Sequence, residues 1–155
     1  MNKVDVNAEE ITLPPWSGSL CEYALKVLDE IERDNWELSV LLCGNKTITQ
    51  LNGQYRNKPE PTDILSFNLG AKVIDDDNVV YLPGDIVISL ETLRENAGYF
   101  QTSEDEELRR LLIHGILHLD GMNHTTTDRN EPMLALQEEI LKRLDLTIIP
   151  HGGAK

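Results

Sequence analysis

The segment 114–124, HGILHLDGMNH, contains three of the four histidines in the chain. Side chains four residues apart lie on the same face of a helix, so His114 and His118 can point at one ion. Gly121 allows the chain to leave the helix and turn back, because glycine readily adopts the left-handed conformation. His124 can then supply a third imidazole. This spacing predicts one divalent metal ion with an open coordination position, which is typical of a catalytic site.

The metal interpretation competes with a simpler one, in which the histidines are ordinary core or surface residues. Two histidines at this spacing occur by chance, but the glycine and the third histidine favour a metal site. Residues 111–119 are apolar on nearly all sides, which predicts a buried helix whose imidazoles need polar partners. Three imidazoles suit zinc, nickel, cobalt and copper(II) alike. We expect zinc, with nickel or another divalent ion as the alternative.

The length and composition of the chain predict one soluble domain. It has 155 residues, of which 40% are hydrophobic and 26% charged, so we expect a single domain over 1–155 with a flexible tail from about 146. No apolar run is long enough for a membrane span, and the first residues lack the apolar stretch of a signal peptide. We therefore expect a cytoplasmic protein without membrane contact. Cys21 and Cys43 have no C-x-x-C spacing and are expected to be free thiols.

The net charge of −13 comes from 27 acidic and 14 basic residues. Broad, nonspecific binding of nucleic acid depends on Lys and Arg, so this balance argues against it. A local basic cleft remains compatible with the composition.

Hydrophobic periodicity predicts an α+β fold, with a small mixed sheet, helices packed on it and the histidine motif on a central helix. Residues 70–82 are expected to form an acidic connector between two strands. Asn45 and Ser89 are expected to cap helices, and Ser103 with Glu106 to form a capping box. The expected strands are 4–12, 37–43, 62–69 and 84–88, and the expected helices are 17–33, 45–55, 89–99, 103–120 and 129–144.

Two sequence blocks together resemble a known family. The segment 51–67, LNGQYRNKPEPTDILSF, is similar to the signature of the YbeY endoribonucleases, which are bacterial rRNA maturation factors, and the block 114–124 matches their histidine motif. The shorter block 84–86, GDI, matches between them, in the order that the family shows. The resemblance implies a mixed four-stranded sheet, a metal held by three histidines, and cleavage of single-stranded RNA in rRNA processing and ribosome quality control. Ribosomal small-subunit proteins or assembly factors are the implied partners.

The resemblance also assigns roles to residues. His114, His118 and His124 correspond to the metal ligands, and Arg56 corresponds to a functional arginine, whereas its residue type alone indicates an ordinary surface side chain. The family commonly has aspartate before the last histidine, and this chain has Asn123. Asparagine can accept a hydrogen bond but carries no charge, so the tuning of the neighbouring ligand is in question.

Metal-dependent cleavage of a phosphodiester would use these residues as follows. A divalent ion lowers the pKa of a bound water from 15.7 to about 7 and can polarise a phosphoryl oxygen. His114 is expected to be a catalytic residue as well as a metal ligand, and the planar guanidinium of Arg56 can bind the phosphate through two hydrogen bonds. Asp63 is open to two interpretations, as a residue that caps the start of a strand or as a proton acceptor beside the metal.

Two other functions are compatible with the motif. Metzincin proteases share the histidine spacing but have a glutamate after the first histidine as general base, where this chain has Gly115. Efficient peptide hydrolysis is hard to reconcile with that absence. A non-catalytic ribosome assembly factor with a structural metal is the second alternative. Dependence of activity on Arg56 would separate it from the nuclease.

Overall fold

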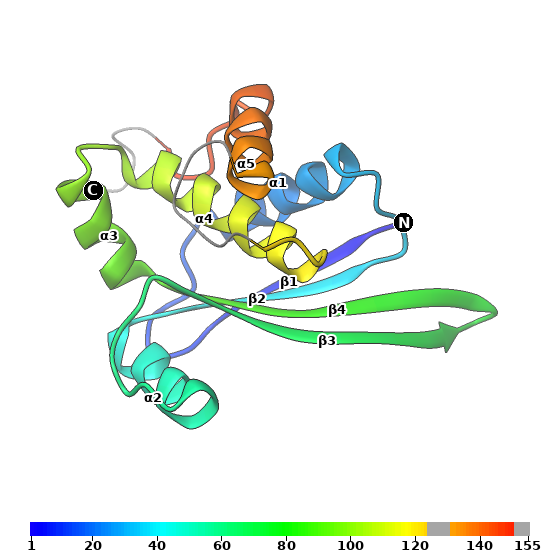
Figure 1. Cartoon of the computed structure of the whole chain (residues 1–155), viewed down its shortest axis with the longest axis horizontal. Coiled ribbons are helices and arrows are strands. Elements are labelled where there is room, and N and C mark those ends of the chain that lie inside the picture. Colours follow the sequence, from blue (N-terminus) through cyan, green and yellow to red (C-terminus); the bar gives the residue numbers. More distant parts are fainter. Residues whose placement is uncertain (124–130, 151–155) are drawn as a thin grey trace.

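The computed structural model describes residues 1–123 and 131–150, which form five helices and four strands (Figure 1). The prediction of an α+β fold is confirmed. The elements are β1 (Lys3–Ala8), α1 (Ser17–Glu30), β2 (Glu37–Cys43), α2 (Asn45–Arg56), β3 (Ile64–Asp75), β4 (Asn78–Ser89), α3 (Leu90–Tyr99), α4 (Glu104–Leu119) and α5 (Pro132–Arg143).

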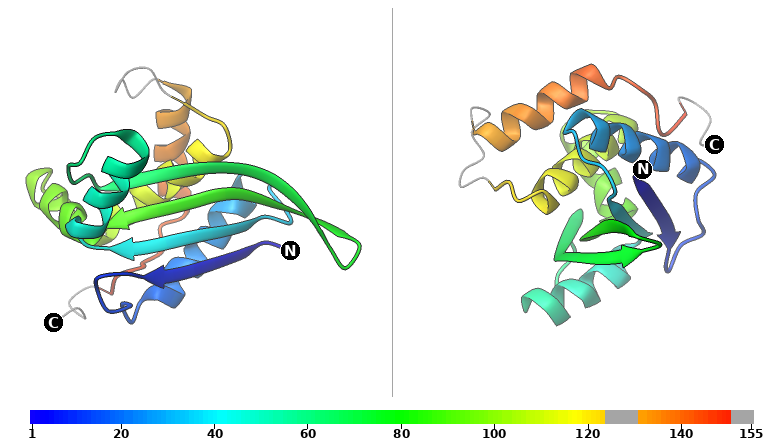
Figure 2. Two further views of the ribbon diagram at one scale, coloured as in Figure 1. Left: turned by 90° about the horizontal axis from the view of Figure 1, so that it is seen from below. Right: turned by 90° about the vertical axis from the view of Figure 1, so that its right-hand side faces the viewer.

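The strands form one mixed sheet in the order β1-β2-β4-β3. β1 pairs with β2 and β2 with β4 in parallel, whereas β3 and β4 form an antiparallel hairpin. Helices α1, α4 and α5 lie on one side of the sheet, and α2 lies on the other, near one end of the strands (Figure 2). The rest of that second face carries no helix of the described chain. We call it the outer face.

The main core lies between the sheet and helices α1, α4 and α5, and a smaller buried cluster of Cys43, Ile48, Leu65 and Val87 lies between the sheet and α2. Leu108, Leu112 and Ile116 of α4 are completely buried, as are Ile86 and Ile88 of β4. The predicted burial of the histidine helix is thereby confirmed. A helix packed so tightly on a sheet holds the side chains of its other faces in fixed directions, which is what a preorganised site requires.

Residues 70–82 were expected to be an acidic connector, and this prediction is wrong. Most of the segment belongs to the long β3–β4 hairpin, whose turn is Asp76-Asp77, with φ of 48° and 68°. Two consecutive positive φ values match the tight turns that suit twisted hairpins. The distal strands are exposed on both faces, so their sequence has no alternation that would reveal a strand. β1 also ends earlier than predicted, at Ala8.

The helix caps follow the predictions in part. Ser89 accepts a hydrogen bond from the backbone of Thr92, and Ser103 from that of Glu106. The carboxylate of Glu106 instead accepts a hydrogen bond from Thr102, so only half of the capping box forms. Asn45 is the first residue of α2 rather than its cap.

The described chain keeps contacts with the core beyond residue 146, where a flexible tail was expected to begin. Ile148 is buried, and the backbone N–H groups of Ile148 and Ile149 both donate to Asp105. Residues 151–155 lie outside the described part of the chain. Cys21 and Cys43 are free thiols, as predicted, and burial raises the pKa of Cys43 to about 12.

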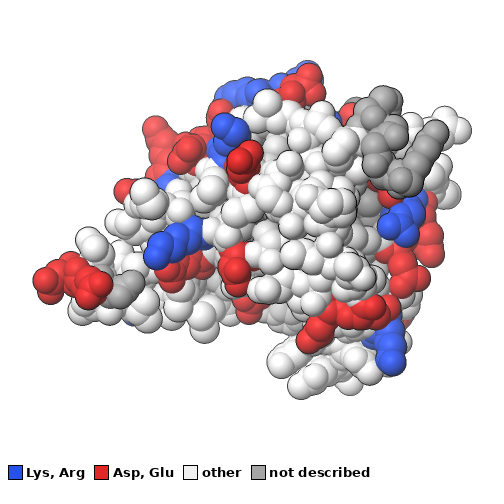
Figure 3. All heavy atoms as spheres, turned by 180° about the vertical axis from the view of Figure 1, so that it is seen from behind, with Lys and Arg blue, Asp and Glu red and all other residues white. Residues whose placement is uncertain are grey.

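The surface reflects the acidic composition. Figure 3 shows acidic groups along the rim and at the hairpin tip, around a broad area without charged side chains. Among the described residues, no helix is both long and apolar enough to cross a membrane.

Candidate active site

Helix α4 ends as its sequence predicts. Gly121 has a φ of +94°, and its backbone N–H donates to the carbonyl of His118, while the N–H of Met122 donates to that of Leu117. These two bonds form a Schellman motif, which satisfies the last carbonyls and turns the chain away from the helix axis. His124, the third predicted ligand, lies outside the described residues.

His114 and His118 stand one turn apart on α4, with ring centroids 5.0 Å apart and planes inclined by 72°. Both are half-buried. They line a pocket of about 330 Å³, which we call the histidine pocket. Its other lining residues are Arg56, Ile64, Ser66, Asn68 and Asn123. In the part of the chain that the structure describes, no group of three His, Cys, Asp or Glu side chains comes close enough to hold a metal ion.

Gln137 of α5 fixes the orientation of His114, a role that no sequence motif indicated. Its amide nitrogen donates to the carboxylate of Glu138 at 3.0 Å, which turns its amide oxygen toward Nδ1 of His114 at 2.6 Å. The reverse orientation would place that oxygen against a carboxylate. Because the oxygen can only accept, Nδ1 of His114 must carry the proton, and Nε2 then carries the lone pair. This is the tautomer that binds a metal through Nε2.

Arg110 of α4 holds the carboxylate of Glu138, to which Gln137 donates. The guanidinium of Arg110 donates to Glu138 at 3.1 Å and to Glu106 at 3.1 Å. Gln137 itself is buried, with 6% of its surface exposed. Two neighbouring helices are thus joined by charge-assisted hydrogen bonds behind the first histidine.

Arg56 reaches the same pocket from the last turn of α2, which is capped by Asn57 in the left-handed conformation. Its Nη2 donates to the carbonyl of Ser66 at 3.0 Å. Of the six arginines in the described ranges, Arg56 alone has no described carboxylate within ion-pair distance. The ion pairs of the other five include Arg33–Asp120, Arg94–Glu104, Arg109–Asp105, Arg110–Glu138 and Arg143–Glu30. The guanidinium is therefore available for an anionic ligand.

No described Asp or Glu side chain lines the histidine pocket, and the acidic candidate Asp63 lies outside it. Asp63 accepts a hydrogen bond from Asn96 at 3.3 Å. Asp120 pairs with Arg33, and Asp85 lines a pocket on the outer face. Glu107 is buried two turns before His114 on α4. Burial raises the pKa of its carboxyl above the ordinary value of 4.5.

Gly115 marks where α4 lies closest to the sheet. A Cβ at this position would lie 3.0 Å from Cδ1 of Ile64 and 3.0 Å from Cδ1 of Ile86. A glutamate, which metzincins have at this place in the motif, would therefore have to enter the helix–sheet interface instead of the pocket. This packing argues against the protease alternative on steric grounds.

Comparisons with known proteins agree with this architecture. The model of the family described as Endoribonuclease YbeY matches residues 4–145. The chain belongs to the YbeY endoribonuclease family. The YbeY endoribonuclease of Treponema pallidum (strain Nichols) is 44% identical over 142 residues, which cover 91% of this chain and 89% of that protein. The YbeY endoribonuclease of Borrelia duttonii (strain Ly) is 44% identical over 147 residues, covering 92% and 96% of the two chains.

A solved structure is also similar. The solution structure of TM1509 from Thermotoga maritima superimposes with a TM-score of 0.64 at 26% identity, over 98% of this chain and 99% of that one. At the level of the YbeY family, the prediction of a hydrolase that cuts RNA is confirmed.

Proposed function

We propose that this protein is a metal-dependent endoribonuclease that cleaves single-stranded RNA in the maturation and quality control of ribosomal RNA. One observation carries the proposal: Arg56 of α2 lines the same pocket as His114 and His118 of α4. A cation without a described carboxylate partner thus lies beside two potential metal ligands. This combination suits a phosphodiester, which needs both charge neutralisation and an activated nucleophile.

The described residues fit a divalent metal. His114 and His118 would hold it, with His124 of the same motif as the third ligand. The hydrogen bond from Nδ1 of His114 to Gln137 selects the tautomer that coordinates through Nε2. Neutral imidazoles are suitable ligands for zinc, and they are equally suitable for nickel or another divalent ion. When bound, the ion would supply a water that ionises near neutral pH and a positive charge for a phosphoryl oxygen.

Arg56 and Asp63 would have separate roles in the reaction. Arg56 would bind the non-bridging oxygens of the phosphate and stabilise the charge that grows on them, because its planar donors match two oxygens at once. Its bond to the carbonyl of Ser66 uses one of its five N–H groups and holds the side chain at the pocket. Asp63 is a weaker candidate for proton acceptor, because its carboxylate is engaged by Asn96.

Substrate selection would follow from size and charge. A pocket of about 330 Å³ can receive one nucleotide of a flexible strand, whereas an A-form duplex holds its phosphates on a rigid surface. The net charge of −13 disfavours broad attraction to RNA. Small-subunit ribosomal proteins or assembly factors would therefore bring the enzyme to rRNA. The enzyme would then act in the cytoplasm.

The test combines elemental analysis of the purified protein with cleavage of a single-stranded RNA and the matching duplex. We expect about one divalent ion per chain, cleavage that favours the single strand, loss of cleavage on chelation and recovery when metal is restored. His118→Ala should lose both metal and activity, whereas His151→Ala, outside the motif, should keep both. A metal-loaded protein that cuts no RNA would instead support the assembly factor, and full metal content in His118→Ala would contradict the site.

A further inference from the structure

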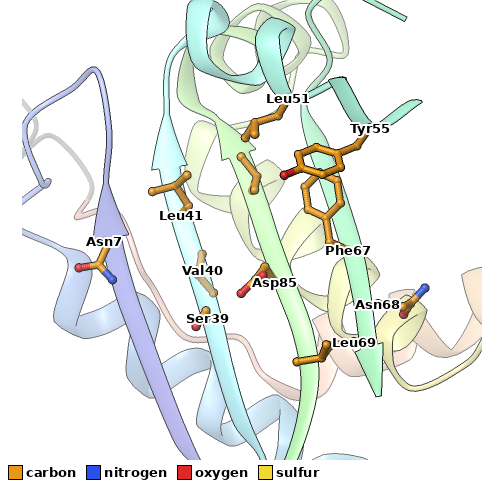
Figure 4. A pocket seen from close by; sticks show the side chains of 11 residues that line it. Asn7, Ser39, Val40, Leu41, Leu51, Tyr55, Phe67, Asn68, Leu69 and Asp85 are labelled. Atoms are coloured by element: carbon orange, nitrogen blue, oxygen red, sulfur yellow. The ribbon is translucent and has the colours of Figure 1, made fainter. Parts of the chain in front are cut away.

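A second pocket lies on the outer face of the sheet, close to the histidine pocket. It has a volume of about 480 Å³, and we call it the outer pocket (Figure 4). Tyr55 of α2, Phe67 of β3, and Asp85 of β4 are among its lining residues, with Ser39 of β2 at its far side. Its floor is apolar and aromatic, and a few polar groups converge on it. This combination is typical of pockets that bind a flat organic group.

The two pockets meet at the edge strand β3. Asn68 lines both of them, and Figure 4 shows it projecting from the outer edge of the strand. Tyr55 lines the outer pocket, whereas its chain neighbour Arg56 lines the histidine pocket. Side chains of successive strand residues point to opposite faces, and accordingly Ser66 faces the histidines while Phe67 faces outward. A ligand that crosses the edge of β3 can therefore occupy both pockets.

An exposed aromatic ring forms one wall of the outer pocket. Tyr55 is 60% exposed, although its ring packs against Phe67 in an edge-to-face arrangement with centroids 5.2 Å apart. Contact with Phe67 holds the ring in place without covering it. A ring that is both fixed and exposed is what proteins use to stack nucleobases of single strands.

A carboxylate lies beside this ring. Asp85 is directly opposite Phe67 in the β3–β4 register, and Ser39 is opposite Asp85 in the β2–β4 register. Asp85 is exposed and forms no ion pair with a cation of the described chain. A carboxylate repels phosphate but accepts hydrogen bonds from the amino groups of bases. The sugar-phosphate chain should therefore stay near Arg56 while the base points toward Asp85.

We propose that the outer pocket binds one unpaired nucleobase of the RNA, adjacent to the phosphate held by Arg56, with Tyr55 as the stacking residue and Asp85 as the acceptor for an amino group. The inference rests on the proposed nuclease function and deepens it. A base can enter this pocket only when it is not paired, so Tyr55 would contribute to the preference for single strands. A base with an exocyclic amino group, such as cytosine, would be preferred over uracil.

The test compares Tyr55→Ala, Tyr55→Leu and Tyr55→Phe in metal-loaded enzyme. The substrate is a single-stranded RNA with one cleavage point, together with versions that lack one base at each neighbouring position in turn. Tyr99→Ala is the matched control, because Tyr99 is 82% exposed and also packs edge-to-face on a neighbour, Phe100, but lines neither pocket. Binding of the same RNAs is measured in parallel with the metal chelated.

We expect Tyr55→Ala and Tyr55→Leu to lower kcat/KM about 10-fold to 100-fold, the scale of losing one stacked base. Tyr55→Phe should recover most of the loss, because it keeps the stacking ring, and Tyr99→Ala should stay close to wild type. Removal of one particular base should lower kcat/KM of the wild type by a similar factor. The same removal should not lower kcat/KM of Tyr55→Ala any further, because that variant has already lost the contact. The single-strand preference of Tyr55→Ala should shrink, and Asp85→Ala should lose the preference for cytosine over uracil at that position.

Equal cleavage by Tyr55→Ala and wild type would overturn the inference, as would a missing base that slows both enzymes equally. Those outcomes leave RNA cleavage intact, so they are distinct from a failure of the proposed function, in which the wild type cuts no RNA. If cleavage fails but RNA binding still depends on Tyr55 and on the same base, the pocket is a base-binding site in a protein without nuclease activity.

Discussion

The two faces of the sheet are built differently. On the helical face, α4 packs its apolar residues onto β3 and β4, and the side chain of Gln137 is locked between His114 and Glu138. On the outer face, Tyr55 and Leu69 are mostly exposed around an open pocket. Groups that hold an ion must be fixed within a fraction of an ångström, whereas a surface that receives a flexible strand can stay open. The contrast indicates that one face is suited to chemistry and the other to recognition.

The largest difference between the faces should appear in stability. Leu112 of α4 is completely buried, whereas Leu69 on the outer face is 63% exposed. Leu112→Ala should lower the free energy of unfolding by about 2–5 kcal/mol, because it removes buried methyl groups and leaves a cavity. Leu69→Ala should change it by no more than about 0.5 kcal/mol. Urea unfolding of both variants measures the difference, and similar losses would contradict the contrast between the packed helical face and the exposed part of the outer face around Leu69.

Gln137→Ala tests how far the packed helical face fixes the first histidine. Without the amide oxygen, Nδ1 of His114 loses the partner that fixes its proton, so metal affinity and RNA cleavage should each fall about 10-fold to 100-fold. Glu139→Gln, at an exposed position of the same helix, is the control and should leave both unchanged. Metal titration and cleavage rates provide the readout. Unaltered metal affinity in Gln137→Ala would show that His114 does not depend on this hydrogen bond.

The smallest expected effect is the contribution of Glu107 to the pH dependence of stability. Its carboxyl faces Arg110, which lowers its pKa, and Asp63, Glu106 and Glu138, which raise it, but burial is the largest effect and the net pKa is raised above 4.5. The folded state thus favours the protonated acid. That contribution is complete below the unfolded pKa and is lost as the pH rises through the folded pKa.

Glu107→Gln should therefore be more stable than wild type at about pH 7, and this advantage should shrink at about pH 4, where wild-type Glu107 is protonated. Unfolding free energies at the two pH values give the comparison. A variant that is less stable at neutral pH would mean that attraction between Glu107 and Arg110 outweighs the cost of burial.

The sequence predicted the parts of the molecule whose signals are local. Periodicity located α4, Ser103 marked its start, and Gly121 marked its end, because each signal lies within a few residues of the feature it specifies. The extension of the β3–β4 hairpin was missed because its distal strands bury neither face. Turn residues Asp76 and Asp77 were interpreted as part of an acidic connector for the same reason.

The site was predicted less completely, because it is assembled from distant segments. His114 and His118 share one helix turn, so their spacing alone suggested a joint role. Gln137 comes from another helix, and only the packing of α5 on α4 brings it to His114. Arg56 was assigned through the family resemblance, and its position in the histidine pocket depends on α2 lying beside β3.

The most direct test of the account is the rate of cleavage by Arg56→Ala under conditions where metal content is measured in the same sample. If Arg56 stabilises charge on the phosphate, the rate on a single-stranded RNA should fall on the order of 10²–10³-fold at matched salt. Arg56→Lys should recover only part of the loss, because an ammonium group lacks the planar pair of donors. Bound metal and unfolding temperature should stay at wild-type values. Wild-type cleavage by Arg56→Ala would contradict the account, and loss of metal from that variant would show that Arg56 supports the structure instead.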